Sequence, residues 1–319
     1  MERQRIPLYK VRQFGEKIND TFSFVSENFK PLFKYVTYFM LPLALLMALA
    51  MNGYMDGVLQ TARNPDAMSA DAIANFAVGY GGIILLSLLM GIILPALIYA
   101  MMRIYSEREN GLKNLTWQEL KPTMMHLLKR NTKLMLAFLF FGLLLFAVFG
   151  VLVALSVAIS TKVVTLGILF IIVLIVGMVV ITVPFSLASP IYLFEEDMTF
   201  IGALKKAFRL GMRTWWGIFG VTLVLYIIIG IVSGVISMPW YIATMAKTFF
   251  GLEGEGAEDS FVNGTMFSFI TYLLGVVQAW VGYLCYSVPV IGMAYQYGHA
   301  SEKVDHVTVA TDIEQFETL

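Results

Sequence analysis

Few residues of this chain have the type and spacing that chemistry requires. The densest acidic run is 195–197, and the histidines are His126, His299 and His306. A hydrolytic or metal site needs a nucleophile beside a base, or ligands at fixed spacing, and the sequence contains no HExxH, GxSxG or GxxxxGK[ST] motif. We therefore expect a non-enzymatic protein with no catalytic residue, no metal site and no bound cofactor.

One arrangement would change that expectation. An enzyme acting on lipid headgroups would need His126, Glu107 and Glu196 to converge within a few Å. The acidic run 195–197 has a simpler interpretation, because acids before a helix complement the dipole of its N-terminus by about 0.3 to 1 kcal/mol. We expect this second role.

The deepest polar residue in the apolar runs is Gln278, followed by Gln296 near the end of the sixth run, and Tyr283 lies five residues after Gln278. An intramembrane polar group can contact a substrate, and Gln278 and Tyr283 are then a candidate intramembrane site. A lone Gln278 is better explained by an interhelical hydrogen bond worth about 0.6 to 2 kcal/mol. The second interpretation predicts helix packing and no ligand.

The elements that must position these residues are six long apolar runs. Their centres lie near residues 44, 90, 146, 178, 231 and 281. Each has about 18 to 20 residues of low charge, enough to cross roughly 30 Å of hydrocarbon as a helix. The chain is 58% hydrophobic and only 14% charged, whereas a soluble domain carries about 25% charge. We predict an all-α integral membrane protein with six transmembrane helices in a single membrane domain, 1–319.

The basic residues predict the orientation. Of 22 Lys and Arg, 19 fall in segments that share one face: seven up to Lys34, seven in 103–133, four in 195–215 and one in the tail. The positive-inside rule then places both termini in the cytoplasm. The opposite loop 248–266 contains Glu253, Glu255, Glu258 and Asp259 and no Lys or Arg. We expect that loop outside.

Each cytoplasmic segment begins with an amphipathic stretch that leads into an odd-numbered span. The apolar positions are Phe14, Ile18, Phe22, Val25 and Phe29; then Leu120, Met124 and Leu127; then Phe200, Leu204, Phe208 and Trp215. Thr116 with Glu119, or Pro122, marks the start of the second helix, and Thr199 caps the third. The third should lie flat in the headgroup region. The basic residues expected to contact headgroups are Lys205, Arg209, Arg213, Lys129 and Arg130.

The same order of amphipathic helix, span, turn and span suggests three parallel repeats. They cover 13–106, 115–198 and 199–302, followed by a cytoplasmic tail, 303–319. Any six-span protein with short loops would show the same order, so ordinary hairpin architecture is an equal alternative. Within the fifth span, Gly230 and Gly234 form a GxxxG pair that should let this helix approach another closely.

The stretch from Pro190 to Gly220, which begins PIYLFEEDMTFIGALKKAFRL, resembles a recurring element of one group of bacterial multispan proteins. That group is the membrane domain associated with glycerophosphodiester phosphodiesterases, together with related uncharacterised inner-membrane families. The opening 14–30 is similar to stand-alone versions of this domain. Ala207 and Phe208 stand where those families often have a Ser-Trp pair, and no phosphodiesterase domain is present. The resemblance implies a bacterial inner-membrane location and no catalytic residue.

Two functions fit these features. The first is a non-enzymatic scaffold, regulatory or assembly component at the cytoplasmic leaflet, with amphipathic helices lining one face. The alternative is a transporter or lipid-handling protein with a cavity between the repeats. Membrane lipids are the expected partners in both cases, other membrane proteins remain open, and the formal net charge of zero gives no reason to expect nucleic acid.

Overall fold

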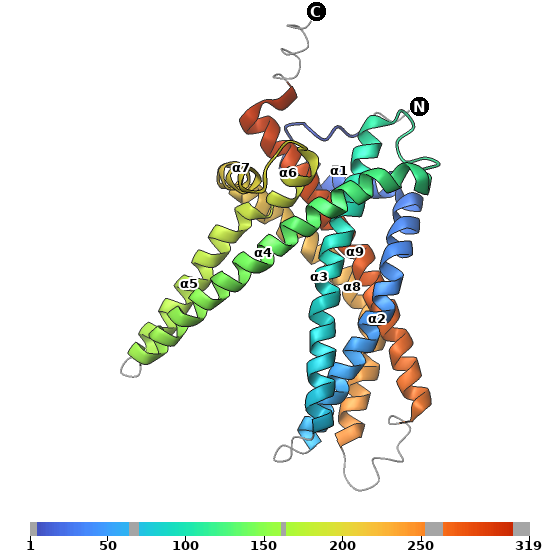
Figure 1. Ribbon diagram of the computed structural model, residues 1–319, viewed down its shortest axis with the longest axis vertical. Helices are drawn as coiled ribbons and strands as arrows, with labels where there is room; N and C mark the ends of the chain where they lie inside the picture. Colours follow the sequence, from blue (N-terminus) through green and yellow to red (C-terminus); the bar gives the residue numbers. More distant parts are fainter. Residues whose placement is uncertain (1–4, 64–69, 161–163, 253–263, 309–319) are drawn as a thin grey trace, which may run out of the picture. The chain divides into compact units, whose positions relative to one another are not determined.

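The computed structural model describes residues 5–63, 70–160, 164–252 and 264–308, and every regular element in these ranges is an α-helix (Figure 1). In chain order the helices are α1 (Phe14–Glu27), α2 (Phe29–Arg63), α3 (Ala70–Glu107), α4 (Trp117–Ser160), α5 (Val164–Phe185), α6 (Ala188–Phe194), α7 (Phe200–Arg213), α8 (Trp215–Leu252) and α9 (Thr265–Asp305). Most of the acidic loop 248–266 and most of the tail 303–319 lie outside the described residues.

Six helical stretches of the described chain are long and apolar enough to cross a membrane. They are Phe29–Ala62, Ile73–Glu107, Trp117–Ala154, Ile172–Phe194, Trp215–Phe250 and Thr265–Asp305. Each exceeds the roughly 20 residues that a spanning helix needs. The predicted all-helical fold with six spans is confirmed. The amphipathic stretch before the third span continues into it without a break, within α4.

The chain divides into two compact units. Unit 1 contains Met1–Glu27, Pro95–Val224 and Pro289–Leu319; unit 2 contains Asn28–Leu94 and Leu225–Val288. Both units draw on segments from more than one of the three suggested repeats. The division therefore does not test repetition, which stays a prediction.

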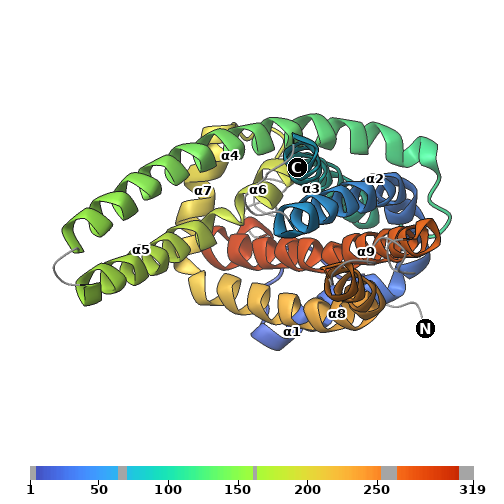
Figure 2. The same cartoon turned by 90° about the horizontal axis from the view of Figure 1, so that it is seen from below.

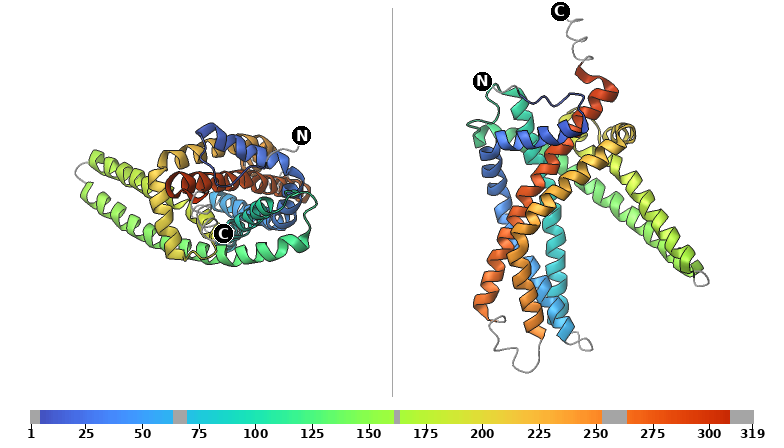
Figure 3. Two further views of the ribbon diagram at one scale, coloured as in Figure 1. Left: turned by 90° about the horizontal axis from the view of Figure 1, so that it is seen from above. Right: turned by 180° about the vertical axis from the view of Figure 1, so that it is seen from behind.

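Unit 2 is a bundle of α2, the first part of α3, the later part of α8 and the first part of α9, which lie side by side in Figures 1 and 3. Gly79 allows the closest approach of α2 and α3, because a Cβ at this position would collide with the backbone of Tyr54. No atom lies within 4 Å of a Cβ built at Gly230 or Gly234. Within the described chain this GxxxG pair makes no close approach to another helix, and an approach to a helix of a second molecule stays a prediction.

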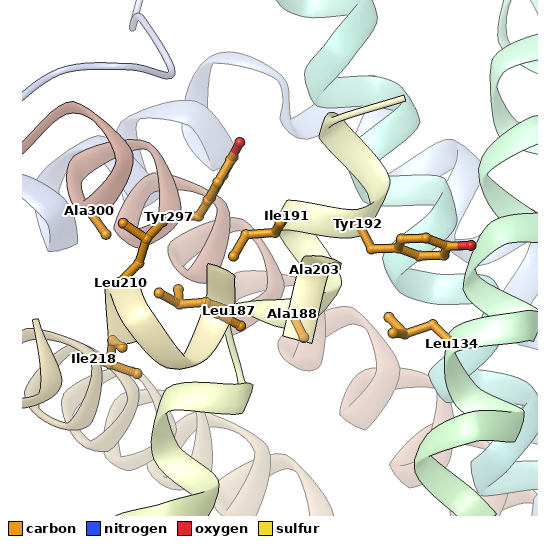
Figure 4. Close-up of a cluster of buried hydrophobic side chains, with 11 residues drawn as sticks. Leu134, Leu187, Ala188, Ile191, Tyr192, Ala203, Leu210, Ile218, Tyr297 and Ala300 are labelled. Atoms are coloured by element: carbon orange, nitrogen blue, oxygen red, sulfur yellow. The ribbon is translucent and has the colours of Figure 1, made fainter. Parts of the chain in front are cut away.

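Unit 1 has its apolar core where α6 and α7 meet α4, α8 and α9. The side chains of this cluster are shown in Figure 4, with Leu187, Ile191 and Leu210 lying together at its centre. α4 and α5 form an antiparallel hairpin, and α7 packs across α5 (Figure 2). At that crossing Gly211 lies against Pro184, where a Cβ would come within 2.6 Å of the Pro184 side chain. A larger residue at 211 would force the two helices apart.

The predicted starts of α4 and α7 are confirmed. The Thr116 backbone N–H donates to Glu119 Oε2 at 2.9 Å, which is the side-chain half of a capping box, and the helix begins at Trp117. Pro122 therefore lies inside the helix rather than at its start. At α7, the Gly202 N–H donates to Thr199 Oγ1 at 3.2 Å. Each cap satisfies a backbone group that the first helical turn leaves without an intrahelical partner.

The apolar positions of the three amphipathic stretches have different surroundings in α4 than in α1 and α7. In α4 the apolar positions Leu120, Met124 and Leu127 are buried. In α1 the buried residues are instead Lys17, Thr21 and Phe24, while the expected face is exposed at Phe14 and half-buried at Ile18, Phe22 and Val25. In α7 the buried residues are Ala203, Ala207, Leu210 and Gly211; Phe208 is exposed, Phe200 and Leu204 are half-buried, and Trp215 belongs to α8.

The outward direction of the large apolar side chains of α1 and α7 has a physical reason. In a soluble protein an apolar stripe turns toward the core, because water lies on the other side. Beside a bilayer the outer surface can meet apolar chains, so large apolar side chains can face outward at little cost. Small or polar residues then make the contacts with the rest of the protein.

Candidate functional site

The acidic residues that follow α6 form ion pairs with α3 and α7. Glu195 Oε1 accepts a hydrogen bond from Lys206 Nζ at 2.7 Å and another from the Tyr297 hydroxyl at 2.6 Å. Arg103 binds Glu196 at 2.6 Å, and this bond is the main cause of the lowered pKa of Glu196. These ion pairs of the acidic residues 195–197 were not predicted from the sequence.

Arg103 lies between the residues that an enzyme acting on lipid headgroups would need, Glu107, Glu196 and His126. It binds Glu107 at 3.2 Å as well as Glu196, and His126 lies near enough to Glu196 to lower its pKa further. Both carboxylates are more than half exposed and are bound to the guanidinium. A general acid near pH 7 needs a raised pKa, so this arrangement is that of a surface ion-pair cluster. Among the described residues, no group of three His, Cys, Asp or Glu side chains lies close enough together to hold a metal ion.

The basic residues expected at headgroups have different surroundings. Arg130 Nη2 donates to the carbonyl oxygens of Glu195 at 2.9 Å and Met198 at 3.2 Å, and the guanidinium lies 4.4 Å from the centre of the Tyr192 ring. Arg130 therefore fixes the turn between α6 and α7. Lys129, its neighbour in the chain, is exposed.

On α7 the basic stripe is exposed along its length. Lys205, Arg209 and Arg213 all lie on the outer side of the helix. Arg209 forms two hydrogen bonds with Asp305, at 2.7 and 2.9 Å, which tie α7 to the end of α9. Lys205 and Arg213 are therefore the members of the stripe best placed to meet another molecule.

Arg12 fixes the N-terminal segment against α1 and α9. Its Nε donates to Asp20 Oδ2 at 2.7 Å, and its backbone N–H donates to His299 Nδ1 at 3.0 Å. The guanidinium also donates to the carbonyl oxygens of Pro7 and Leu8, and its side chain is fully buried. Figure 3 shows α1 crossing the C-terminal part of α9, close to where this segment lies.

Lys17 differs from the other buried basic residues of unit 1. Its relative exposure is 4%, yet its ammonium group forms no hydrogen bond or ion pair with any described residue. Burial lowers the pKa of Lys17 to about 8, and the positive charges of Lys303 and Arg12 lower it further in the same direction. Lys17 is thus a buried residue that lies near two other positive charges, those of Lys303 and Arg12.

Gln296 lies beside Lys17 and likewise has no hydrogen-bond partner within the described part of the chain. It is fully buried, and neither its Oε1 nor its Nε2 has a hydrogen bond. Lys17 Nζ and Gln296 Nε2 each lie 3.2 Å from the point that a Cβ would occupy at Gly217. Two donors from α1 and α9 therefore meet a position of α8 that carries no side chain. We call Lys17, Gln296 and Gly217 the Lys17 site.

The intramembrane candidates Gln278 and Tyr283 lie in unit 2. Gln278 Oε1 and the Tyr283 hydroxyl are buried without a hydrogen bond, so the interhelical hydrogen bond expected of Gln278 is not made through this oxygen. Five residues apart on α9, they are separated by roughly 140° around the helix, since an α-helix has 3.6 residues per turn. They therefore leave α9 in different directions, and their role as a candidate intramembrane site stays a prediction.

The Lys17 site was not predicted from the sequence. Its three residues come from helices far apart in the chain, and Lys17 lies between the apolar residues Phe14 and Ile18, which determined the expected face of α1. The available signal was the spacing of Lys17, Thr21 and Phe24 along one side of α1, which the structure shows to be the buried side. No protein family, no curated protein and no solved structure was found to match the chain.

Proposed function

We propose that the chain is a non-enzymatic scaffold, regulatory or assembly component of a bacterial inner membrane, acting at the cytoplasmic leaflet. The six membrane-length helices support a multi-pass protein. The distribution of Lys and Arg supports cytoplasmic termini. The bacterial inner membrane comes from the resemblance of 14–30 and 190–220 to bacterial multispan domains.

The observation that carries the proposal is the arrangement of α7. One side of this helix, made of small residues, packs into unit 1. The outer side exposes an apolar stripe of Ile201, Phe208 and Met212 directly beside Lys205 and Arg213. An apolar stripe bordered by basic residues favours a position in the headgroup region of an anionic leaflet, with about 1 kcal/mol of attraction for each basic residue.

The contacts that hold α7 in place support a structural role for its outer surface. Thr199 caps its start, Lys206 binds Glu195 and Arg209 binds Asp305. A helix that is anchored on its inner side can present one constant surface at the membrane boundary, which a scaffold requires. A photo-reactive residue at position 208 would report directly on what this surface contacts.

The test is cross-linking in intact cells that express the full chain with a benzophenone residue at Phe208. We expect a protein adduct of one defined mass, and we expect the assembly state of that protein to change in cells that lack the chain. Combining Lys205→Glu with Arg213→Glu should abolish the adduct, because the reversed charges repel the anionic leaflet. Combining Lys113→Glu with Lys121→Glu, exposed outside α7 with the same change in charge, should leave it unchanged.

Two results would contradict the proposal. One is that position 208 cross-links only to lipid while the chain migrates alone in native gels. The other is that both charge-reversed proteins lose the adduct equally, since the effect would then come from total charge rather than from α7.

A further inference from the structure

Lys17 is a buried residue whose ammonium group has no carboxylate partner among the residues that the structure describes. Arg12, Arg103 and Lys206 all bind carboxylates within unit 1. Lys17 has no such bond with any residue that the structure describes, although it is almost as buried as Arg12. Removing an unpaired charge from water costs several kcal/mol, so buried charges are normally paired. An anion supplied from outside the chain would remove this cost.

Gln296 gives a second and independent indication of a ligand. Buried polar side chains almost always have a hydrogen-bond partner, and a buried amide that has none calls for an unseen one. The Nε2 of Gln296 and the Nζ of Lys17 approach the same point at Gly217, each at 3.2 Å. A Gln amide and an ammonium group are both hydrogen-bond donors. An acceptor with several oxygen atoms could use both.

The surface next to the site is apolar. Phe14 and Trp216 are exposed, and the Phe14 ring lies 2.9 Å from the point that a Cβ would occupy at Gly220. Leu223, one helical repeat beyond Trp216 on the same side of α8, is exposed as well. A hydrocarbon chain could lie along this part of α8 while its headgroup reached Lys17.

We propose that the Lys17 site binds a phosphate-type anion, with Lys17 Nζ and Gln296 Nε2, which both approach Gly217, as the donors. Two sources have this chemistry, the phosphate of an anionic lipid headgroup and inorganic phosphate. The exposed apolar residues Phe14 and Trp216 favour the lipid. The site would bind its ligand whether or not the chain is a scaffold.

The experiment uses the full chain in nanodiscs, with thermal unfolding and native mass spectrometry as readouts. The probes are phosphatidylglycerol in a phosphatidylcholine bilayer and inorganic phosphate added to a bilayer of phosphatidylcholine alone. Lys17→Met and Gln296→Leu should each weaken binding by about 10-fold to 100-fold, since a hydrogen bond to a charged group is lost. Lys113→Met, which removes an exposed lysine outside the site, should bind like the wild type.

Gly217→Ala keeps both donors, so it still tests the site if Lys17→Met or Gln296→Leu fails to fold. Its methyl group would occupy the point where the two donors meet, so it should weaken binding while Lys17 remains charged. Stabilisation by phosphatidylglycerol but not by phosphate identifies a lipid site, and stabilisation by phosphate in the neutral bilayer identifies a site for the free anion.

The proposal is overturned if neither probe stabilises the wild type. It is also overturned if Lys17→Met, Gln296→Leu and Gly217→Ala retain phosphatidylglycerol as well as Lys113→Met does. A structural lysine would give a third result that overturns it, in which Lys17→Met is destabilised to the same extent with and without each probe.

Discussion

Replacing Arg12 with Met should lower the free energy of unfolding by roughly 3 to 5 kcal/mol, the range measured when one partner of a buried ion pair is removed. The Arg12 side chain is fully buried, and Asp20, its partner at 2.7 Å, is 19% exposed. Arg12→Met would leave Asp20 without its cation and the carbonyl oxygen of Leu8 without its donor. Because Asp20 retains some contact with water, we expect a value near the lower end of the range.

The measurement is denaturant unfolding in a neutral detergent, with limited proteolysis of residues 5–13 as a second readout. Lys10→Met is the matched control, because Lys10 lies 4.0 Å from Glu16 and both side chains are nearly half exposed. Surface pairs contribute about 1 kcal/mol or less. Equal losses in Arg12→Met and Lys10→Met would show that Arg12 does not anchor the segment.

Lys17 should make the stability of the protein depend on alkaline pH. Its pKa is 10.5 in the unfolded chain and about 8 in the folded protein. The unfolded state therefore binds more protons between these values, and stability rises with pH across this window. The destabilisation is fully present below about pH 8 and disappears above 10.5.

Lys17→Met should remove this pH dependence. In phosphate-free neutral detergent we expect the variant to be more stable than the wild type at pH 7, with the difference shrinking as pH rises from 8 toward 10.5. The wild type and the variant are compared at each pH, so that the titration of other lysines and tyrosines cancels. A difference that stays constant from pH 7 to 10.5 would contradict the lowered pKa. An anion bound beside Lys17 should reduce the dependence, because it favours the charged form.

The sequence predicted which faces of the short helices are apolar but not the direction in which they point. Periodicity reports that Phe14 and Ile18, or Ile201 and Phe208, share a side of a helix. It does not report whether that side meets protein or lipid. In α1 and α7 the packing is made by Thr21, Ala203 and Ala207, small or polar residues that carry little weight in a hydrophobic pattern.

The spans and the caps were predictable because their signals are local. An apolar run of about 20 residues identifies a membrane-length helix by itself, and Thr199 needs only the first turn of α7 for its capping bond. The Lys17 site depends on contacts between residues 17, 217 and 296, which no local pattern contains. The pairing of Glu195 with Lys206 and Tyr297 was not predictable for the same reason.

The central claim is that the polar network of unit 1 lies at the cytoplasmic leaflet. It is tested by labelling single cysteines in intact cells with an impermeant reagent, after Cys285 has been replaced by Ala. Gly256→Cys, in the acidic loop 248–266, should react from outside, because this loop contains four acids and is predicted to lie opposite the basic segments.

Glu109→Cys, in the exposed turn between α3 and α4, should react only after the membrane has been permeabilised. The opposite pattern, with Glu109→Cys labelled from outside and Gly256→Cys protected, would place α7 and the Lys17 site on the wrong side of the membrane and contradict the account.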